Sequence, residues 1–268
     1  DLDAHAYGPN EFFSSNWVYE GLVAYGEGGQ VVPSLAASYR VEKDNELGGD
    51  TITFTLQEGV TFHDGQPWNC DAAKLNFDHV LAGALRDYHG WYGLPKVTED
   101  WFCNNDMEFV IRTNQKHGPF LQELTLIRPI RMVSPAVFPN GNASDPFLEN
   151  SCNLNWGTIN AVETDTQILE EIKCVGLKCV AGTGPFKFDS RDTGTITTDE
   201  GETEVDNKVV FTAHESYWDG APDIKRLEVI RYESSEEVKA ALLSEELDLV
   251  WGVGVLTASD IVEFREND

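Results

Sequence analysis

Hydrophobic and polar positions alternate from Thr51 to Leu56, so that Ile52, Phe54 and Leu56 fall on one side and three threonines on the other. A period of two is typical of a half-buried β-strand. After a predicted turn at residues 63–67, Asn69 or Asp71 can cap a helix. The apolar face of this helix would contain Ala73, Phe77, Val80, Leu81 and Ala84.

The last part of the chain shows the same change of period. Ser234 followed by Glu237 forms a capping box, which predicts a helix that buries Val238, Ala241 and Leu242. A strand is predicted next, from the spacing of Leu247, Leu249 and Trp251, and Thr257 with Asp260 can begin one more helix. Strands and helices that follow one another predict an α/β or α+β architecture with a mixed β-sheet.

Two segments interrupt this alternation. Residues 193–207 are rich in Thr, Asp, Glu and Gly, which indicates an exposed hairpin or loop. Residues 151–179 hold three of the five cysteines, which are Cys70, Cys103, Cys152, Cys174 and Cys179. Five cysteines allow two disulfides with one thiol left over and favour an oxidising, extracytoplasmic compartment. Cys174 and Cys179 have no second clustered pair, so a zinc site is not expected.

Asn142-Ala143-Ser144 is a sequon, which would carry a glycan at Asn142 in a eukaryotic secretory pathway.

Charge narrows the range of partners. The 268 residues include 46 acidic and 19 basic side chains, a net charge of −27, and 41% are hydrophobic. This is enough apolar content for one large domain or two modest ones. The acidic surface would repel nucleic acid and anionic membranes, so neither is expected as a partner.

No stretch of the sequence approaches the 18 or so apolar residues that cross a bilayer. The chain begins at Asp1 without a leader, which is expected of a processed product or a trimmed piece.

An arginine in an apolar segment is the leading candidate for ligand contact. Arg128 lies in the stretch Gly118–Pro135, away from any basic run. A guanidinium can hold a ligand carboxylate through two parallel hydrogen bonds. The alternative is a structural arginine paired with an internal Asp or Glu, and the local pattern leaves both readings open.

Seven short segments carry a resemblance to a known family. They are Leu2–His5, Val18–Leu22, Val32–Ala36, Thr53–Gly65, Gly182–Phe186, Tyr217–Pro222 and Leu247–Leu249. Taken in order they resemble the substrate-binding proteins of bacterial ABC importers for dipeptides, oligopeptides and nickel complexes, the solute-binding proteins of family 5. Residues 119–131 are most similar to the nickel-binding members. The resemblance covers only the first of the family's two lobes.

The resemblance implies a periplasmic-binding-protein-like (type II) lobe, with a mixed β-sheet and flanking helices. It divides residues 1–268 into a main-sheet subdomain of about residues 1–45 and 182–268 and an inserted subdomain of residues 46–181, with the Cys-rich segment 151–179. Because it places Cys70 and Cys103 in the same subdomain, they are the preferred disulfide pair. Cys152 would then pair with Cys174 or Cys179.

Ligand contacts also follow from the resemblance. Arg128 matches the arginine that meets ligand carboxylates at the interlobe cleft, Trp91 matches an aromatic wall of the pocket, and Tyr7 lies at its rim. Tyr88 stands where relatives have a second arginine, and Phe12 where they have a methionine. Trp91 has a second interpretation as core or lid packing. Gly184 is expected in a cleft or hinge segment, or as a plain backbone turn.

The implied function is extracytoplasmic binding of a small peptide or a metal (nickel) chelate for uptake, with a membrane permease or a receptor as partner and no cofactor. One lobe alone offers only half of the surface that would enclose a ligand, so it is expected to bind its ligand weakly. The sequence also bears on two other functional classes. An enzyme is not expected, because the sequence has no Gly-x-Ser-x-Gly elbow, His-Glu-x-x-His or phosphate loop. The remaining alternative is an extracellular sensor or scaffold lobe that has lost transport-type binding.

Overall fold

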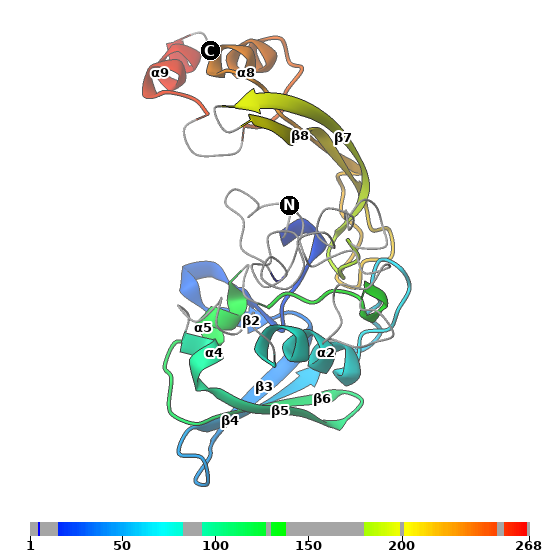
Figure 1. Ribbon diagram of the computed structural model, residues 1–268, viewed down its shortest axis with the longest axis vertical. Coiled ribbons are helices and arrows are strands. Elements are labelled where there is room, and N and C mark those ends of the chain that lie inside the picture. Colours follow the sequence, from blue (N-terminus) through cyan, green and yellow to red (C-terminus); the bar gives the residue numbers. More distant parts are fainter. Residues whose placement is uncertain are drawn as a thin grey trace. The chain divides into compact units, whose positions relative to one another are not determined.

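The computed structural model describes residues 5, 16–82, 93–126, 130–137, 180–198, 201–250 and 255–266 (Figure 1). The chain divides into two compact units. The first comprises Asp1–Asp189 and Phe211–Arg226, and the second comprises Ser190–Val210 and Leu227–Asp268. These boundaries differ from the subdomain division expected from the resemblance, which stays a prediction.

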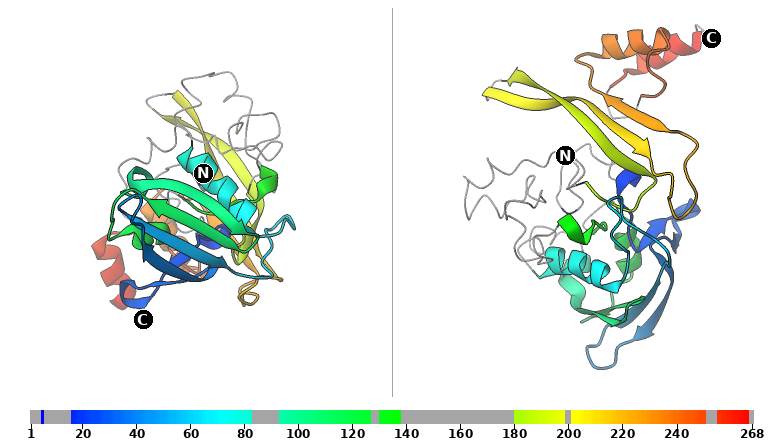
Figure 2. Two further views of the ribbon diagram at one scale, coloured as in Figure 1. Left: turned by 90° about the horizontal axis from the view of Figure 1, so that it is seen from below. Right: turned by 90° about the vertical axis from the view of Figure 1, so that its right-hand side faces the viewer.

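The first unit is built on a four-stranded antiparallel sheet, shown in blue to green in Figure 2. Its strand order is β3 (Ala36–Lys43), β4 (Asp50–Leu56), β6 (Glu108–Thr113) and β5 (Thr98–Asn105). The strand predicted from the alternation is β4. Ile52, Phe54 and Leu56 are buried, and Ile52 and Phe54 lie opposite Ile111 and Phe109 of β6.

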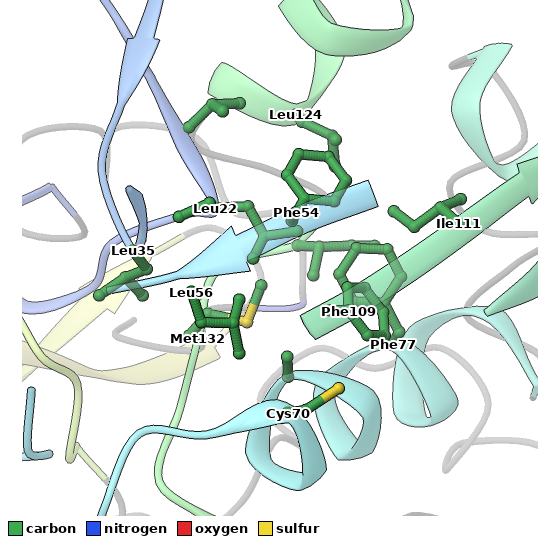
Figure 3. Packing of buried hydrophobic residues seen from close by; sticks show 14 of the residues in the cluster. Leu22, Leu35, Phe54, Leu56, Cys70, Phe77, Phe109, Ile111, Leu124 and Met132 are labelled. Atoms are coloured by element: carbon green, nitrogen blue, oxygen red, sulfur yellow. The ribbon is translucent and has the colours of Figure 1, made fainter. Parts of the chain in front are cut away.

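Helix α2 (Cys70–Leu81) covers the buried face of this sheet at β5 and β6. Of the two predicted caps, Asn69 is the N-cap, and its side chain accepts a hydrogen bond from the Ala72 amide at 2.9 Å. Phe77 of α2 packs on Phe109 with ring centroids 4.8 Å apart (Figure 3). Ala84 lies outside the described residues.

The core continues from this sheet into the other elements of the first unit. Leu22, Leu35, Leu124 and Met132 belong to the same buried cluster as Phe54 (Figure 3). The remaining elements are β1 (Val23–Tyr25), η1 (Glu27–Gly29), β2 (Val31–Pro33), α4 (Gly93–Val97), α5 (Phe120–Thr125) and η2 (Pro135–Val137), with β1 and β2 paired antiparallel. One core therefore includes residues on both sides of position 45, where the subdomain boundary was expected.

The preferred disulfide is confirmed. Cys70 at the start of α2 is bonded to Cys103 in β5, with their Cα atoms 5.8 Å apart. The bond ties the helix to the edge strand of the sheet that it covers. Cys152, Cys174 and Cys179 lie outside the described residues, so the second pairing stays a prediction.

The second unit contains most of a three-stranded sheet and two helices. The sheet order is β7 (Phe186–Thr198), β8 (Gly201–Ala213) and β9 (Arg226–Ile230), and the helices are α8 (Ser235–Leu243) and α9 (Ala258–Glu266). The described residues of the acidic segment 193–207 lie on the neighbouring strands β7 and β8, which agrees with the predicted hairpin. Arg191 and Asp206 pair across these strands, with Nε and Oδ1 2.7 Å apart.

Both predicted helix starts in this unit are confirmed. The Ser234 side chain accepts a hydrogen bond from the Glu237 amide at 3.2 Å, and the Glu237 carboxylate accepts one from the Glu233 amide at 2.9 Å. At α9, the Thr257 hydroxyl accepts from the Asp260 amide, and Asp260 accepts from the Thr257 amide. Side chains thus satisfy amides that the first helical turn leaves unpaired.

The strand predicted at residues 247–251 is wrong over its described part. Residues 247–250 form no strand, and Leu249 is 65% exposed. The amides of Glu246 and Leu247 both donate to the Ala241 carbonyl, at 2.9 and 3.1 Å. These hydrogen bonds close the C-terminal turn of α8. The Leu247 amide, at the start of the predicted strand, is therefore used by the helix end and cannot pair with a neighbouring strand.

This helix end predicts a stabilising substitution. Glu245 has a φ of 60°, which makes it the one non-glycine residue with positive φ in the described ranges. Glycine adopts this conformation without the Cβ penalty, so Glu245→Gly is expected to raise the free energy of unfolding by about 0.5–1 kcal/mol in urea titrations. The same change at Glu246, which has no positive φ, should lower it by a similar amount. Two changes of the same sign would contradict the prediction.

Candidate functional site

Most of the residues proposed for ligand contact lie outside the described ranges. These are Tyr7, Phe12, Tyr88, Trp91 and Arg128, and the sequon at Asn142 is outside them as well. Gly184 is described, and so are the residues that flank positions 91 and 128. The structure therefore shows the frame next to the candidate site, and the contacts themselves stay predictions.

Gly184 is fixed by its own backbone groups. Its amide donates to the Val18 carbonyl at 2.9 Å. Its carbonyl accepts from His63 Nε2 at 2.9 Å and lies 3.3 Å from His214 Nδ1. A Cβ at this position would lie 2.5 Å from the Trp17 carbonyl oxygen, so no larger residue fits without a shift. Close packing thus accounts for the glycine, and its place in a cleft or hinge segment stays a prediction.

Several of the segments that carry the family resemblance meet here. We call the residues Glu20, His63, Gly184, Tyr217 and Trp218 the motif junction. Glu20 accepts hydrogen bonds from the Tyr217 hydroxyl at 2.7 Å and from Trp218 Nε1 at 3.0 Å. Together with the bond from His63 to Gly184, these contacts join residues up to 198 positions apart. The resemblance pointed to these segments, but the sequence did not show that their side chains pair.

Burial changes the ionisation of this region. Burial raises the pKa of the Glu20 carboxyl, and the hydrogen bonds from Trp218 and Tyr217 partly oppose the shift. Burial also lowers the pKa of Arg131 to about 10, against the attraction of Glu20. The pKa of His63 is lowered to about 3, mainly by burial, and burial lowers the pKa of His214 too.

Arg131 is a structural arginine within the stretch that contains Arg128. Its Nη2 donates to the Asn16 side-chain oxygen at 3.0 Å and to the Thr125 carbonyl at 3.1 Å. Its own carbonyl is hydrogen-bonded to His5 Nε2 at 2.7 Å. The guanidinium thus ties the end of α5 to the residues that follow position 128. The sequence left a structural role open for Arg128 and did not single out Arg131.

Asn76 holds the next part of this stretch. Its side-chain oxygen accepts from the Val133 amide at 3.0 Å, and its Nδ2 donates to the Val133 carbonyl at 3.0 Å and to the Ala72 carbonyl at 2.9 Å. Both backbone groups of Val133 are therefore satisfied by a single buried side chain. On either side, the Met132 amide donates to the Glu20 carbonyl and the Ser134 amide to the Ala181 carbonyl.

A second anchor lies two residues after position 91. The Glu123 carboxylate accepts from the amides of Gly93 and Leu94 at 3.2 and 2.5 Å and is 2.8 Å from His117 Nε2. A carboxylate at these free amides stabilises the start of α4. Positions 91 and 128 are thus each followed by a segment that side chains hold in place.

The described part of the chain contains neither a candidate metal site nor a candidate membrane span. No group of three or more His, Cys, Asp or Glu side chains is placed there to hold a metal ion. No helix among those residues is long and apolar enough to cross a bilayer.

Comparison with known proteins gives a consistent result. The family described as bacterial extracellular solute-binding proteins, family 5, middle region, matches residues 30–266. The chain is 30% identical over 267 residues to the nickel-binding periplasmic protein of Escherichia coli K12, which covers 99% of this chain and 42% of that protein. It is 25% identical over 219 residues to heme-binding protein A of Haemophilus influenzae, covering 80% of this chain and 34% of that protein.

Solved structures agree with the sequence relatives. NikA from Brucella suis in complex with Fe(III)-EDTA matches with a TM-score of 0.76 and 28% identity, over 99% of this chain and 44% of that chain. The chain spans less than half the length of these relatives. The predicted α/β lobe with flanking helices is confirmed, and the family's extracellular description agrees with the predicted extracytoplasmic location. The chain belongs to the bacterial extracellular solute-binding proteins of family 5.

Proposed function

We propose that this chain forms part of an extracytoplasmic solute-binding protein that delivers a small peptide or a metal (nickel) chelate to a membrane permease. The match to family 5 over residues 30–266 carries the proposal. The named ligands of relatives support it, since they include nickel, a dipeptide and Fe(III)-EDTA. A dipeptide and EDTA both carry carboxylates, which the guanidinium of an arginine can bind through two parallel hydrogen bonds. We assign the chain a role in binding and no role in catalysis.

In this proposal Arg128 receives the ligand carboxylate, with Trp91, Tyr88, Tyr7 and Phe12 around it. The frame on either side supports this assignment. Arg131 and Asn76 hold the residues after position 128, and Glu123 holds those after position 91. Residues that their neighbours already hold in place lose less conformational freedom when a ligand binds. Arg131 donates to the internal oxygens of Asn16 and Thr125, so we assign the ligand carboxylate to Arg128.

Substituting Arg128 tests the assignment. Isothermal titration calorimetry with Fe(III)-EDTA and with a dipeptide should show weaker binding for Arg128→Lys, because an ammonium cannot form two parallel hydrogen bonds. Arg128→Ala should cost about 2–4 kcal/mol of binding free energy in an enclosed site. Neither change should lower the melting temperature by more than a few degrees.

Arg131→Ala is the matched control, three residues later in the same stretch. Because Arg131 is buried and bonded to internal oxygens, its removal should lower thermal stability strongly. If Arg128→Ala behaves in the same way, Arg128 is structural. If the parent chain binds neither probe, even when joined to a second lobe from a relative, the sensor or scaffold alternative replaces uptake.

A further inference from the structure

Two imidazole rings share one carbonyl at the motif junction. The Gly184 oxygen lies 2.9 Å from His63 Nε2 and 3.3 Å from His214 Nδ1. The two rings are perpendicular, with centroids 5.0 Å apart. Since a carbonyl can only accept, both rings must present an N–H to it. This fixes the neutral tautomers, with hydrogen on Nε2 of His63 and on Nδ1 of His214.

The remaining nitrogen of each ring is then a bare acceptor. His63 Nδ1 is buried and has no hydrogen-bond partner among the residues that the structure describes. His214 Nε2 lies 3.2 Å from the Ser216 hydroxyl. A proton added to His63 would therefore lie on a buried nitrogen for which the described part of the chain provides no acceptor. A proton on His214 would require only that the Ser216 hydroxyl turn. His63 is thus the ring for which protonation conflicts most with the closed geometry.

The charged groups that face the two rings also oppose protonation. Lys187 at the start of β7 acts on both rings, and each ring would repel the other if both were charged. Tyr217 lies beside His214, with ring centroids 6.4 Å apart, but its hydroxyl is already bonded to Glu20. Within the described ranges no carboxylate pairs with His63 or His214. The lowered pKa values of both histidines agree with this arrangement.

The shared carbonyl lies at the centre of a backbone crossing. The His63 amide donates to the Gly182 carbonyl at 2.8 Å, and the Gly184 amide donates to the Val18 carbonyl at 2.9 Å. The His214 amide donates to the Pro185 carbonyl at 2.8 Å. Residues 182–185 are thus bound to three other segments of the first unit. Loss of the two imidazole hydrogen bonds would leave residues 182–185 held here by the backbone hydrogen bonds alone.

We propose that His63 and His214 form an acid-sensitive latch on Gly184, which is closed while both rings are neutral and releases residues 182–185 on acidification. The inference does not depend on the ligand or on Arg128. In the open state each histidine regains an ordinary pKa near 6.5, so the open state binds more protons as the pH falls below that value. From pH 7.5 to 5.0, His63 alone should raise the opening equilibrium about 30-fold.

Hydrogen–deuterium exchange of the chain at pH 7.5 and 5.0 tests the latch, after correction for the intrinsic exchange rate at each pH. Peptides that cover residues 182–186 and 62–66 should lose about 30-fold in protection at pH 5.0. Peptides from β4 should keep theirs. The double variant His63→Gln and His214→Asn places amide donors near the positions of the two imidazole N–H groups, and it should lose the response to acid. His117→Gln, a histidine beside Glu123, should retain it.

Equal protection at the two pH values in the parent chain would overturn the proposal, as would an unchanged acid response in the double variant. If the double variant does not fold, NMR titration of the parent's His63 Cε1–H signal decides. The signal should show a neutral ring for as long as the native resonances persist. A midpoint near pH 6.5 with native resonances intact would show that protonation does not open the latch.

Discussion

Asn76→Asp is expected to lower the free energy of unfolding by about 3–5 kcal/mol at pH 7. Asn76 is fully buried, and its Nδ2 donates to the carbonyls of Ala72 and Val133. Aspartate is nearly the same size, but it would place an oxygen against both carbonyls and a charge in the core. The loss should appear in urea unfolding followed by circular dichroism, and it should shrink as the new carboxyl is protonated at acid pH.

Asn45→Asp provides the matched control, because it makes the same chemical change at an exposed turn. Its effect should stay within about 0.5 kcal/mol. Asn76→Ala separates charge from lost hydrogen bonds, since it leaves the amide and carbonyl of Val133 unpaired without adding a charge. If Asn76→Asp were as mild as Asn45→Asp, the stretch after position 128 would not be held by Asn76.

The elements that the sequence predicted correctly are determined by residues that are close together in the sequence. The period of β4, the Asn69 cap of α2 and the capping boxes at Ser234 and Thr257 depend on side chains within a few positions of one another. The predicted strand at residues 247–251 failed at its start for a similar reason. Its alternation was read without the end of α8, which uses the amides of Glu246 and Leu247.

The motif junction could be located from the sequence but not assembled from it. Glu20 and Trp218 are 198 residues apart, and Asn76 and Val133 are 57 apart. No period or spacing connects such pairs, because their distance is set by the path of the chain through the core. The resemblance drew attention to Gly184 as a ligand or hinge position. The structure adds the physical reason for the glycine, which is the close approach of Trp17 and Val18.

Glu20→Leu is expected to destabilise the protein by about 3–5 kcal/mol. The buried carboxylate accepts from both Tyr217 and Trp218, so its loss leaves a partly buried hydroxyl and a partly buried indole N–H unpaired. It also removes the negative group whose attraction favours charged Arg131. Glu58→Leu, at an exposed turn, should change stability by no more than about 0.5 kcal/mol. Both values can be measured by urea unfolding of the full chain.

A double-mutant cycle with Tyr217→Phe gives the sharper test of this contact. If Glu20 and Tyr217 stabilise the junction through their hydrogen bond, removing both should cost at least about 1 kcal/mol less than the sum of the single changes, since the second change removes a group that the first left unpaired. Tyr39→Phe combined with Glu20→Leu should be additive, because Tyr39 packs against Phe54 in the sheet and makes no contact with Glu20. Additivity within about 0.5 kcal/mol in both cycles would mean that Glu20 stabilises the fold through Arg131 or Trp218, and that the short contact to Tyr217 contributes little.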